Sequence, residues 1–155
     1  MPPFDIGTIR LLIIRNDVKA LYAFLDENTV PGLCLLAAGI AAEHDNLPIM
    51  STLLAKLDPA DNVMIFFYNT ITYNAHACFK FLLSHPALDV MHQDGMFFKH
   101  AIDKNQLYML SRLCCHPTAK LDDLFLCDNV KYAAECRNCP AALFLDAFIP
   151  PVCTK

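Results

Sequence analysis

Pairs of large apolar residues recur along the chain at a nearly constant distance. The intervals between successive pairs are 29, 29, 31 and 31 residues, and the pairs are Phe24-Leu25, Leu53-Leu54, Leu82-Leu83, Leu113-Cys114 and Phe144-Leu145. Each pair is followed within a few residues by a proline, which cannot continue a helix; these are Pro31, Pro59, Pro86, Pro117 and Pro150. A fixed period of about 30 residues is typical of stacked supersecondary units.

Each of these units divides again into two apolar stretches around a polar break. Asn and Asp dominate the breaks and suit both a helix exit and an N-cap; the breaks are Asn16-Asp17, residues 43–46, Tyr73-Asn74, residues 103–105 and Arg137-Asn138. The pattern predicts helices at 63–72 and 76–84 in the third unit, and at 96–102 and 106–115 in the fourth. The first unit is expected at 9–25 and the last at 124–148, with its final helix ending near Ile149.

The pattern predicts an all-α fold: an array of about five stacked helical hairpins, which amounts to some ten helices. No sustained alternation of apolar and polar residues indicates strands. The run from Val63 to Tyr68 could be a buried strand on composition alone, but its place in the repeat favours a helix. A length of 155 residues fits one domain, so we expect a single helical-repeat domain over 1–155 with short tails at 1–8 and 150–155.

One part of the chain resembles an ankyrin repeat. The resemblance is carried by residues 82–90, which read Leu-Leu-Ser-His-Pro-Ala-Leu-Asp-Val, and by residues 94–101. Residues 112–117 repeat the His-Pro ending one unit later. In this ending, the chain resembles the divergent ankyrin arrays of large DNA viruses and intracellular pathogens. The chain lacks the family's Thr-Pro-Leu-His opening and has only four glycines, so a generic α-hairpin solenoid is the close alternative.

The resemblance to ankyrin repeats implies a binding scaffold. Stacked repeats form a continuous surface, and the partner, usually a protein, is held on the loop tips and the adjoining face of the first helices. The candidate contact residues in the short connections are Asn28, His44, Asp61, Gln93, Asp94 and Asp122. Each of them also fits a solvated turn residue, and Asp122 with Asp123 fits an N-cap.

Composition narrows the functions that the chain can have. It is 55% hydrophobic and 18% charged, below the charged fraction of about 25% in soluble domains. This composition indicates either a large hydrophobic core or an apolar surface that a partner or a second copy of the chain covers. The first and last units are both more apolar than is usual for the exposed ends of a repeat array. The net charge is −4 and the 12 basic residues are scattered, so nucleic-acid binding is not expected.

The sequence also predicts that the chain neither crosses a membrane nor carries a leader. The longest apolar run, from Leu33 to Ala42, is about half of the ~20 residues that a span needs. The first residues lack a basic region ahead of an apolar stretch. We therefore expect a cytoplasmic protein.

Eight cysteines raise the question of metal or thiol chemistry. Most lie in apolar helical stretches and fit small buried hydrophobes in a reducing compartment. Cys136 and Cys139 form a Cys-x-x-Cys pair that, with Cys127, could hold zinc or act in redox chemistry. A second clean pair is absent, and no phosphate loop or catalytic signature is present, so we expect no metal, no cofactor and no enzyme.

Aromatic residues gather in the third unit and at the start of the fourth. They are Phe66, Phe67, Tyr68, Tyr73, Phe79, Phe81, Phe97 and Phe98. Most fit the core between units, but their density suggests that some face a partner as binding anchors. The sequence is thus compatible with three functions: a non-catalytic protein-binding scaffold, a structural subunit of a larger assembly, or a zinc- or thiol-dependent protein.

Overall fold

The computed structural model describes residues 5–28 and 32–148, without the side chains of residues 59–61. Within these ranges the chain is entirely helical and has no strand, which confirms the predicted all-α class. The ten helices are α1 (Ile6–Ile14), α2 (Val18–Glu27), α3 (Leu33–Glu43), α4 (Leu47–Lys56), α5 (Pro59–Thr72), α6 (His76–Leu83), α7 (His92–Asp103), α8 (Leu107–Cys114), α9 (Asp123–Glu135) and α10 (Cys139–Asp146).

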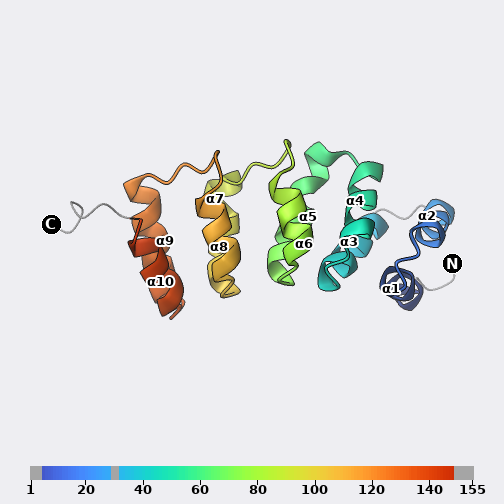
Figure 1. Cartoon of the computed structure of the whole chain (residues 1–155), viewed down its shortest axis with the longest axis horizontal. Coiled ribbons are helices and arrows are strands. Elements are labelled where there is room, and N and C mark those ends of the chain that lie inside the picture. The colour runs from blue at the N-terminus through green and yellow to red at the C-terminus, as the bar shows by residue number, and fades with distance from the viewer. Residues whose placement is uncertain (1–4, 29–31, 149–155) are drawn as a thin grey trace. The chain divides into compact units, whose positions relative to one another are not determined.

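The chain divides into two compact units, unit 1 (Met1–Leu88) and unit 2 (Asp89–Lys155). Unit 1 holds the hairpins α1/α2, α3/α4 and α5/α6, and unit 2 holds α7/α8 and α9/α10 (Figure 1). In unit 1, α3 contacts both α1 and α5, while α4 contacts both α2 and α6. In unit 2, α9 contacts α7 and α10 contacts α8. First helices therefore meet first helices inside each unit.

The turn inside each hairpin has the same backbone structure. One residue in each turn is left-handed, with φ between 46° and 57°: Asn16, Asp45, Asn74, Asn105 and Arg137. The next residue donates its N–H to the carbonyl five residues earlier, at 2.8–2.9 Å, as in the Schellman ending of a helix. Four of the five left-handed residues are Asn or Asp, which tolerate this conformation best after glycine. The predicted polar breaks are thus confirmed as helix ends.

The residue after each left-handed position begins the second helix. Asp17, Asn46 and Asn138 cap this helix with their own side chains, as the sequence predicted for Asn and Asp at the breaks. Ala75 cannot cap α6. Asp45 of the preceding hairpin replaces it, because its carboxylate accepts the N–H groups of Ala77 and Cys78, both at 2.9 Å.

Capping asparagines also tie neighbouring hairpins together. Asn46 donates from Nδ2 to the carbonyl of Ile13 at 2.8 Å in unit 1. Asn138 donates to the carbonyl of Ile102 at 2.7 Å in unit 2. Each acceptor lies in the last turn of a first helix one hairpin earlier, so the same type of bond occurs in both units. One side chain therefore begins a helix and also binds the preceding hairpin.

Two His-Pro steps close the second helices with the same turn. The carbonyl of His85 accepts the N–H of Leu88, and its Nδ1 accepts the N–H of Ala87. His116 makes the equivalent bonds with Ala119 and Thr118. Both histidines therefore have a structural role in ending the second helix. The described prolines lie outside helix interiors: Pro48, Pro59 and Pro140 in first turns, Pro86 and Pro117 in loops.

Several boundaries differ from the sequence prediction. Helix α1 begins at Ile6, three residues before the expected start, so the predicted tail 1–8 is shorter. Helix α10 ends at Asp146 and not near Ile149. The tail at 150–155, Pro31 and Cys153 lie outside the described residues, and the single-domain organisation stays a prediction. No helix within the described ranges has the length and apolar character needed to cross a bilayer.

The start of α7 holds a conformation that the sequence did not predict. Gln93, Asp94 and Gly95 are all left-handed, with φ of 48°, 54° and 76°. The ring of Phe125 lies against Gly95, because a β-carbon added there would be 2.5 Å from Cε2 of Phe125. Phe125 also packs edge-on against Phe98, with ring centroids 5.1 Å apart. Glycine is therefore required at residue 95 for both conformation and space.

Candidate functional site: a groove on the first helices of unit 1

A groove of about 310 Å³ runs over the first helices of unit 1. It is lined by Ile6 and Arg10 of α1, by Leu35, Leu36, Gly39, Ile40 and Glu43 of α3, and by Asn69 and Tyr73 of α5. Three large apolar side chains remain exposed around it: Ile6 at 48%, Leu36 at 39% and Tyr73 at 46%. Exposed apolar side chains gathered around a concavity mark binding surfaces more often than scattered ones do.

The charges at the groove neutralise one another. Nη1 of Arg10 lies 2.8 Å from Oε1 of Glu43, so that α1 and α3 are joined by an ion pair. The hydrogen bond from Arg10 lowers the pKa of Glu43 below its ordinary value. Both side chains are solvent-exposed, so the pair itself adds little stability. Its effect on the site is to leave the groove without net charge.

Gly39 lies at the middle of the groove and has no structural reason to be glycine. It sits inside α3, and the nearest atom to an added β-carbon would be Nδ2 of Asn69 at 3.8 Å, an ordinary contact. Glycine in a helix interior costs about 0.5–1 kcal/mol relative to alanine. The same position, six residues before each left-handed turn residue, holds a long side chain in the other hairpins: Arg10, Tyr68, Lys99 and Lys131. Gly39 therefore opens a gap in this row.

Asn69 supplies the uncommitted polar group of the groove. It is half-buried on α5, and its side chain makes no hydrogen bond within the described part of the chain. A carboxamide can donate and accept at once, which matches a peptide group. The groove thus combines an apolar lining, a paired charge, a gap at Gly39 and a free carboxamide.

The residues predicted as partner contacts lie elsewhere. Asn28 donates to the carbonyl of Phe24, Asp122 accepts the N–H of Phe125, and His44 is the C-cap of α3. Gln93 and Asp94 are exposed in the left-handed segment of α7, and the side chain of Asp61 lies outside the described residues. None of the described ones lines the groove. Their role in binding stays a prediction.

Only part of the aromatic set is accessible to a partner, and its role as binding anchors stays a prediction. Phe66, Phe67, Phe79, Phe97 and Phe98 are fully buried, which confirms that most of the aromatic residues belong to the core. Tyr68 is half-buried, whereas Tyr73 and Phe81 are exposed. Tyr73 is the one that lines the groove. The polar break that contains Tyr73 could have suggested this, because a residue at a helix end is less enclosed than one in mid-helix.

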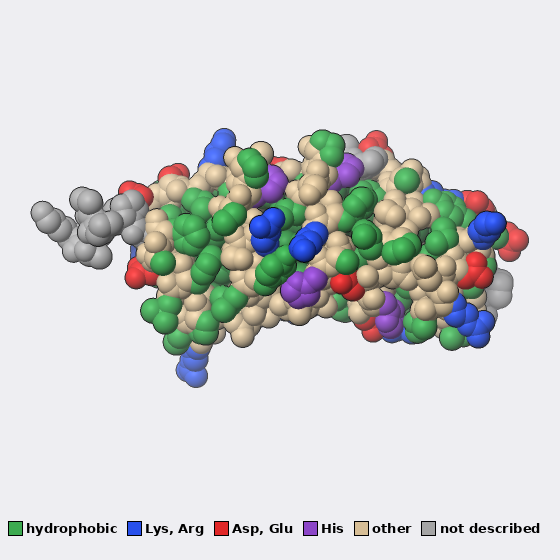
Figure 2. Space-filling view, viewed as in Figure 1, with side chains coloured by type: hydrophobic (Ala, Val, Ile, Leu, Met, Phe, Trp, Pro, Cys, Tyr) green, Lys and Arg blue, Asp and Glu red, His purple; other side chains and the backbone are tan. Residues whose placement is uncertain are grey.

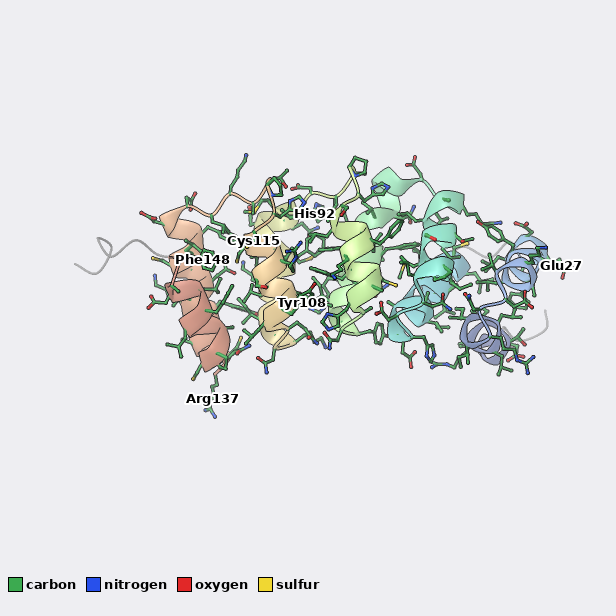
Figure 3. The ribbon with its side chains drawn as sticks, in the orientation of Figure 1. Glu27, His92, Tyr108, Cys115, Arg137 and Phe148 are labelled. Carbon is green, nitrogen blue, oxygen red and sulfur yellow. The ribbon has the colours of Figure 1, made fainter. Side chains whose placement is uncertain are left out.

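A second cleft of about 310 Å³ lies in unit 2 at the hairpin turns. Asp103 there accepts the hydroxyl of Tyr132 at 2.7 Å and the thiol of Cys136 at 3.5 Å. Desolvation and the bond to Asp103 raise the pKa of Cys136, which keeps the thiol protonated. This opposes the redox use of the Cys-x-x-Cys pair, since the thiolate is the nucleophile. Figure 3 shows Arg137 projecting from the turn of this hairpin.

The structure does not support the zinc hypothesis for Cys127, Cys136 and Cys139. Cys136 ends α9 and Cys139 begins α10, so the pair straddles the turn as the repeat predicted. Cys127 is half-buried in α9, and no group of three or more His, Cys, Asp or Glu within the described ranges is placed to hold a metal ion. The seven described cysteines are free, and among them only Cys78 and Cys114 are buried. Burial raises the pKa of each of these two thiols to about 12.

Comparisons with known proteins do not identify a relative. The chain matches no family model, no curated protein and no solved structure. On the face shown in Figure 2, the Lys and Arg side chains form no continuous stripe. Any functional assignment therefore rests on the geometry of the groove itself.

Proposed function

We propose that the chain is a non-catalytic protein-binding scaffold, built from stacked ankyrin-like helical hairpins, that holds a partner segment in the groove of unit 1. The observation that carries the proposal is the gap at Gly39, flanked by exposed apolar side chains. A glycine that costs helix stability without a packing reason fits close approach by a ligand. The neutral Arg10–Glu43 pair favours an uncharged segment.

Free cysteines support the cytoplasmic location that we propose with this function. Cys115, Cys136 and Cys139 are exposed and unpaired, which fits a reducing compartment. The raised pKa of Cys136 and the absence of a metal-type cluster among the described residues support a non-catalytic role. The partner is expected to be a protein, and nucleic acid is not expected because the basic residues are scattered.

The test is to fill the groove without disturbing the helix. A phage-displayed library of random peptides is selected on the full chain, and the peptides obtained are measured by fluorescence polarisation. The Gly39→Phe variant fills the gap and should weaken binding about tenfold or more, whereas the matched Gly39→Ala variant should bind as the natural chain does. The proposal fails if no peptide is selected, or if Gly39→Phe binds the peptides with unchanged affinity while remaining folded by circular dichroism.

A further inference from the structure

Helix α1 has an apolar face that is exposed among the described residues of unit 1. It reads Ile-Gly-Thr-Ile-Arg-Leu-Leu-Ile-Ile and is apolar on nearly all sides, yet only Ile9 and Ile13 are buried. Leu11 is 53% exposed and Ile14 is 56% exposed. Together with Gly7 they are spaced i, i+4 and i+7, so they share one face. Helices that are hydrophobic all round are normally buried, which indicates that this face has a partner.

The neighbouring helix α2 also leaves small apolar residues accessible. In α2, Leu21 and Leu25 are buried, whereas Ala23 is exposed and Ala20 and Phe24 are half-buried. Leu11 and Ile14 do not line the groove around Gly39, so this is a separate surface. We call the face formed by Gly7, Leu11, Ile14, Ala20 and Ala23 the outer face of the first hairpin.

Charges around the outer face are separated along the hairpin axis. Arg15, Asp17 and Lys19 are exposed at the turn, where α1 ends and α2 begins. Asp17 accepts the N–H of Ala20 as the N-cap of α2, and the two basic residues leave this end with a net positive charge. Asp5 and Glu27 are exposed at the opposite end, where α1 begins and α2 ends. Figure 3 shows Glu27 on the side of α2 away from the other helices of unit 1. One end of the outer face is therefore basic and the other acidic.

We propose that the outer face of the first hairpin joins two copies of this chain in a two-fold dimer. In an antiparallel pairing, the turn of one copy meets the open end of the other, so Arg15 of one lies near Glu27 of the other. A two-fold interface uses the same patch on both copies, and a patch with opposite charges at its two ends is complementary to itself in this arrangement. Gly7 permits close approach of the two α1 helices. This dimer goes beyond the proposed groove and does not depend on it.

The last hairpin provides an internal comparison. Leu143 of α10 is 73% exposed, more than any residue of the outer face. Its exposed neighbours one turn away in α10 are Cys139, Pro140, Asp146 and Ala147, and Leu124 of α9 is 72% exposed as well. Leu143 is the same residue type as Leu11 and is more exposed, but it belongs to the last hairpin of unit 2. Leu143 is therefore a matched control for Leu11.

The experiment is sedimentation equilibrium of the full chain over a range of concentrations. We expect a monomer–dimer equilibrium in which Leu11→Asp raises the dissociation constant about tenfold or more, while Leu143→Asp leaves it unchanged. Arg15→Glu and Glu27→Lys should each weaken the dimer, and the two together should restore it, because the exchanged charges again face one another. Circular dichroism checks that each variant is folded.

Three outcomes would overturn the proposal. The first is a chain that stays monomeric at every concentration. The second is equal loss of association in Leu11→Asp and Leu143→Asp, which would indicate contact between first and last hairpins. The third is a monomer that floats with phosphatidylcholine vesicles only while Leu11 is present, which would assign the face to a membrane surface. Gly39→Phe should not affect the dimer, so failure of the groove proposal is distinguishable from failure of this one.

Discussion

The groove of unit 1 and the cleft of unit 2 have the same volume, about 310 Å³, but differ in what their polar groups already bind. In the cleft, Asp103 accepts from Tyr132 and Cys136, and Asn138 donates to the carbonyl of Ile102. In the groove, Asn69 makes no hydrogen bond within the described ranges, and apolar side chains are exposed. Polar groups that hold hairpins together are not free to recognise a ligand, so cavity volume alone does not identify a site.

Two glycines, one in each unit, differ in the same way: one is needed for the fold and the other is not. Gly95 in unit 2 is left-handed and lies against Phe125, so it is needed for folding. Gly39 in unit 1 is helical and meets only an ordinary contact with Asn69. A glycine whose removal should stabilise the chain requires another explanation, which binding provides. Substitutions at and around the two glycines test this contrast, and the largest effect is expected at Gly95.

Gly95→Ala should destabilise the chain by about 2–4 kcal/mol, because it combines left-handed strain with a clash against the Phe125 ring. The free energy of unfolding in urea measures the loss. In a Phe125→Leu background the steric part should shrink while the conformational part remains. An effect below about 1 kcal/mol would show that the ring moves away freely and that the two glycines do not differ as described.

Asp45→Gly should destabilise the chain by about 1–2 kcal/mol, since α6 loses the carboxylate that caps Ala77 and Cys78. Glycine keeps the left-handed turn unstrained, so the loss reports the cap alone. Asn105→Gly is the matched control in unit 2, where α10 is capped by Asn138 itself. Chemical denaturation should show no decrease in the free energy of unfolding for that control. Equal decreases in both variants would mean that the substitution acts on the turn and not on the cap of α6.

Gly39→Ala should stabilise the chain by about 0.5–1 kcal/mol, because alanine is favoured over glycine in a helix interior. The 3.8 Å distance to Nδ2 of Asn69 leaves room for the added methyl group. Thermal unfolding followed by circular dichroism gives the change in melting temperature. A decrease in stability would mean that Gly39 has a structural role like that of Gly95.

The smallest effect concerns His100 of unit 2. Burial lowers the pKa of His100 below its ordinary value, Lys104 lowers it further, and Asp103 opposes the shift. The folded state therefore resists protonation, so the stability that neutral His100 contributes is present above the unfolded pKa near 6.5 and is lost as the pH falls below it. Urea unfolding at about pH 7 and about pH 5.5 should show a larger loss for the natural chain than for His100→Gln. Equal losses would contradict the assignment.

Part of the fold could be predicted because it depends on neighbours in sequence. Asn16, Asn74 and Asn138 marked breaks that became left-handed turns or helix caps, and the apolar pairs marked second helices. The groove could not be predicted in the same way. In the sequence, Gly39 is one more small residue in an apolar run. The missing side chain becomes evident only when Gly39 is compared with Arg10 and Tyr68, which occupy the equivalent position in the neighbouring hairpins. That row is evident once the turns are aligned.

The amino-acid sequence alone determined where the two helices of each hairpin are separated, because capping, left-handed turns and apolar periodicity act within a few residues. Tertiary structure decided which side chains are covered, since burial depends on helices about 30 residues away in the sequence. Asp45 illustrates the limit: the sequence predicts a turn residue, but only the neighbouring hairpin makes it the cap of α6. The same reason separates Phe67, which is fully buried, from Tyr73, which lines the groove.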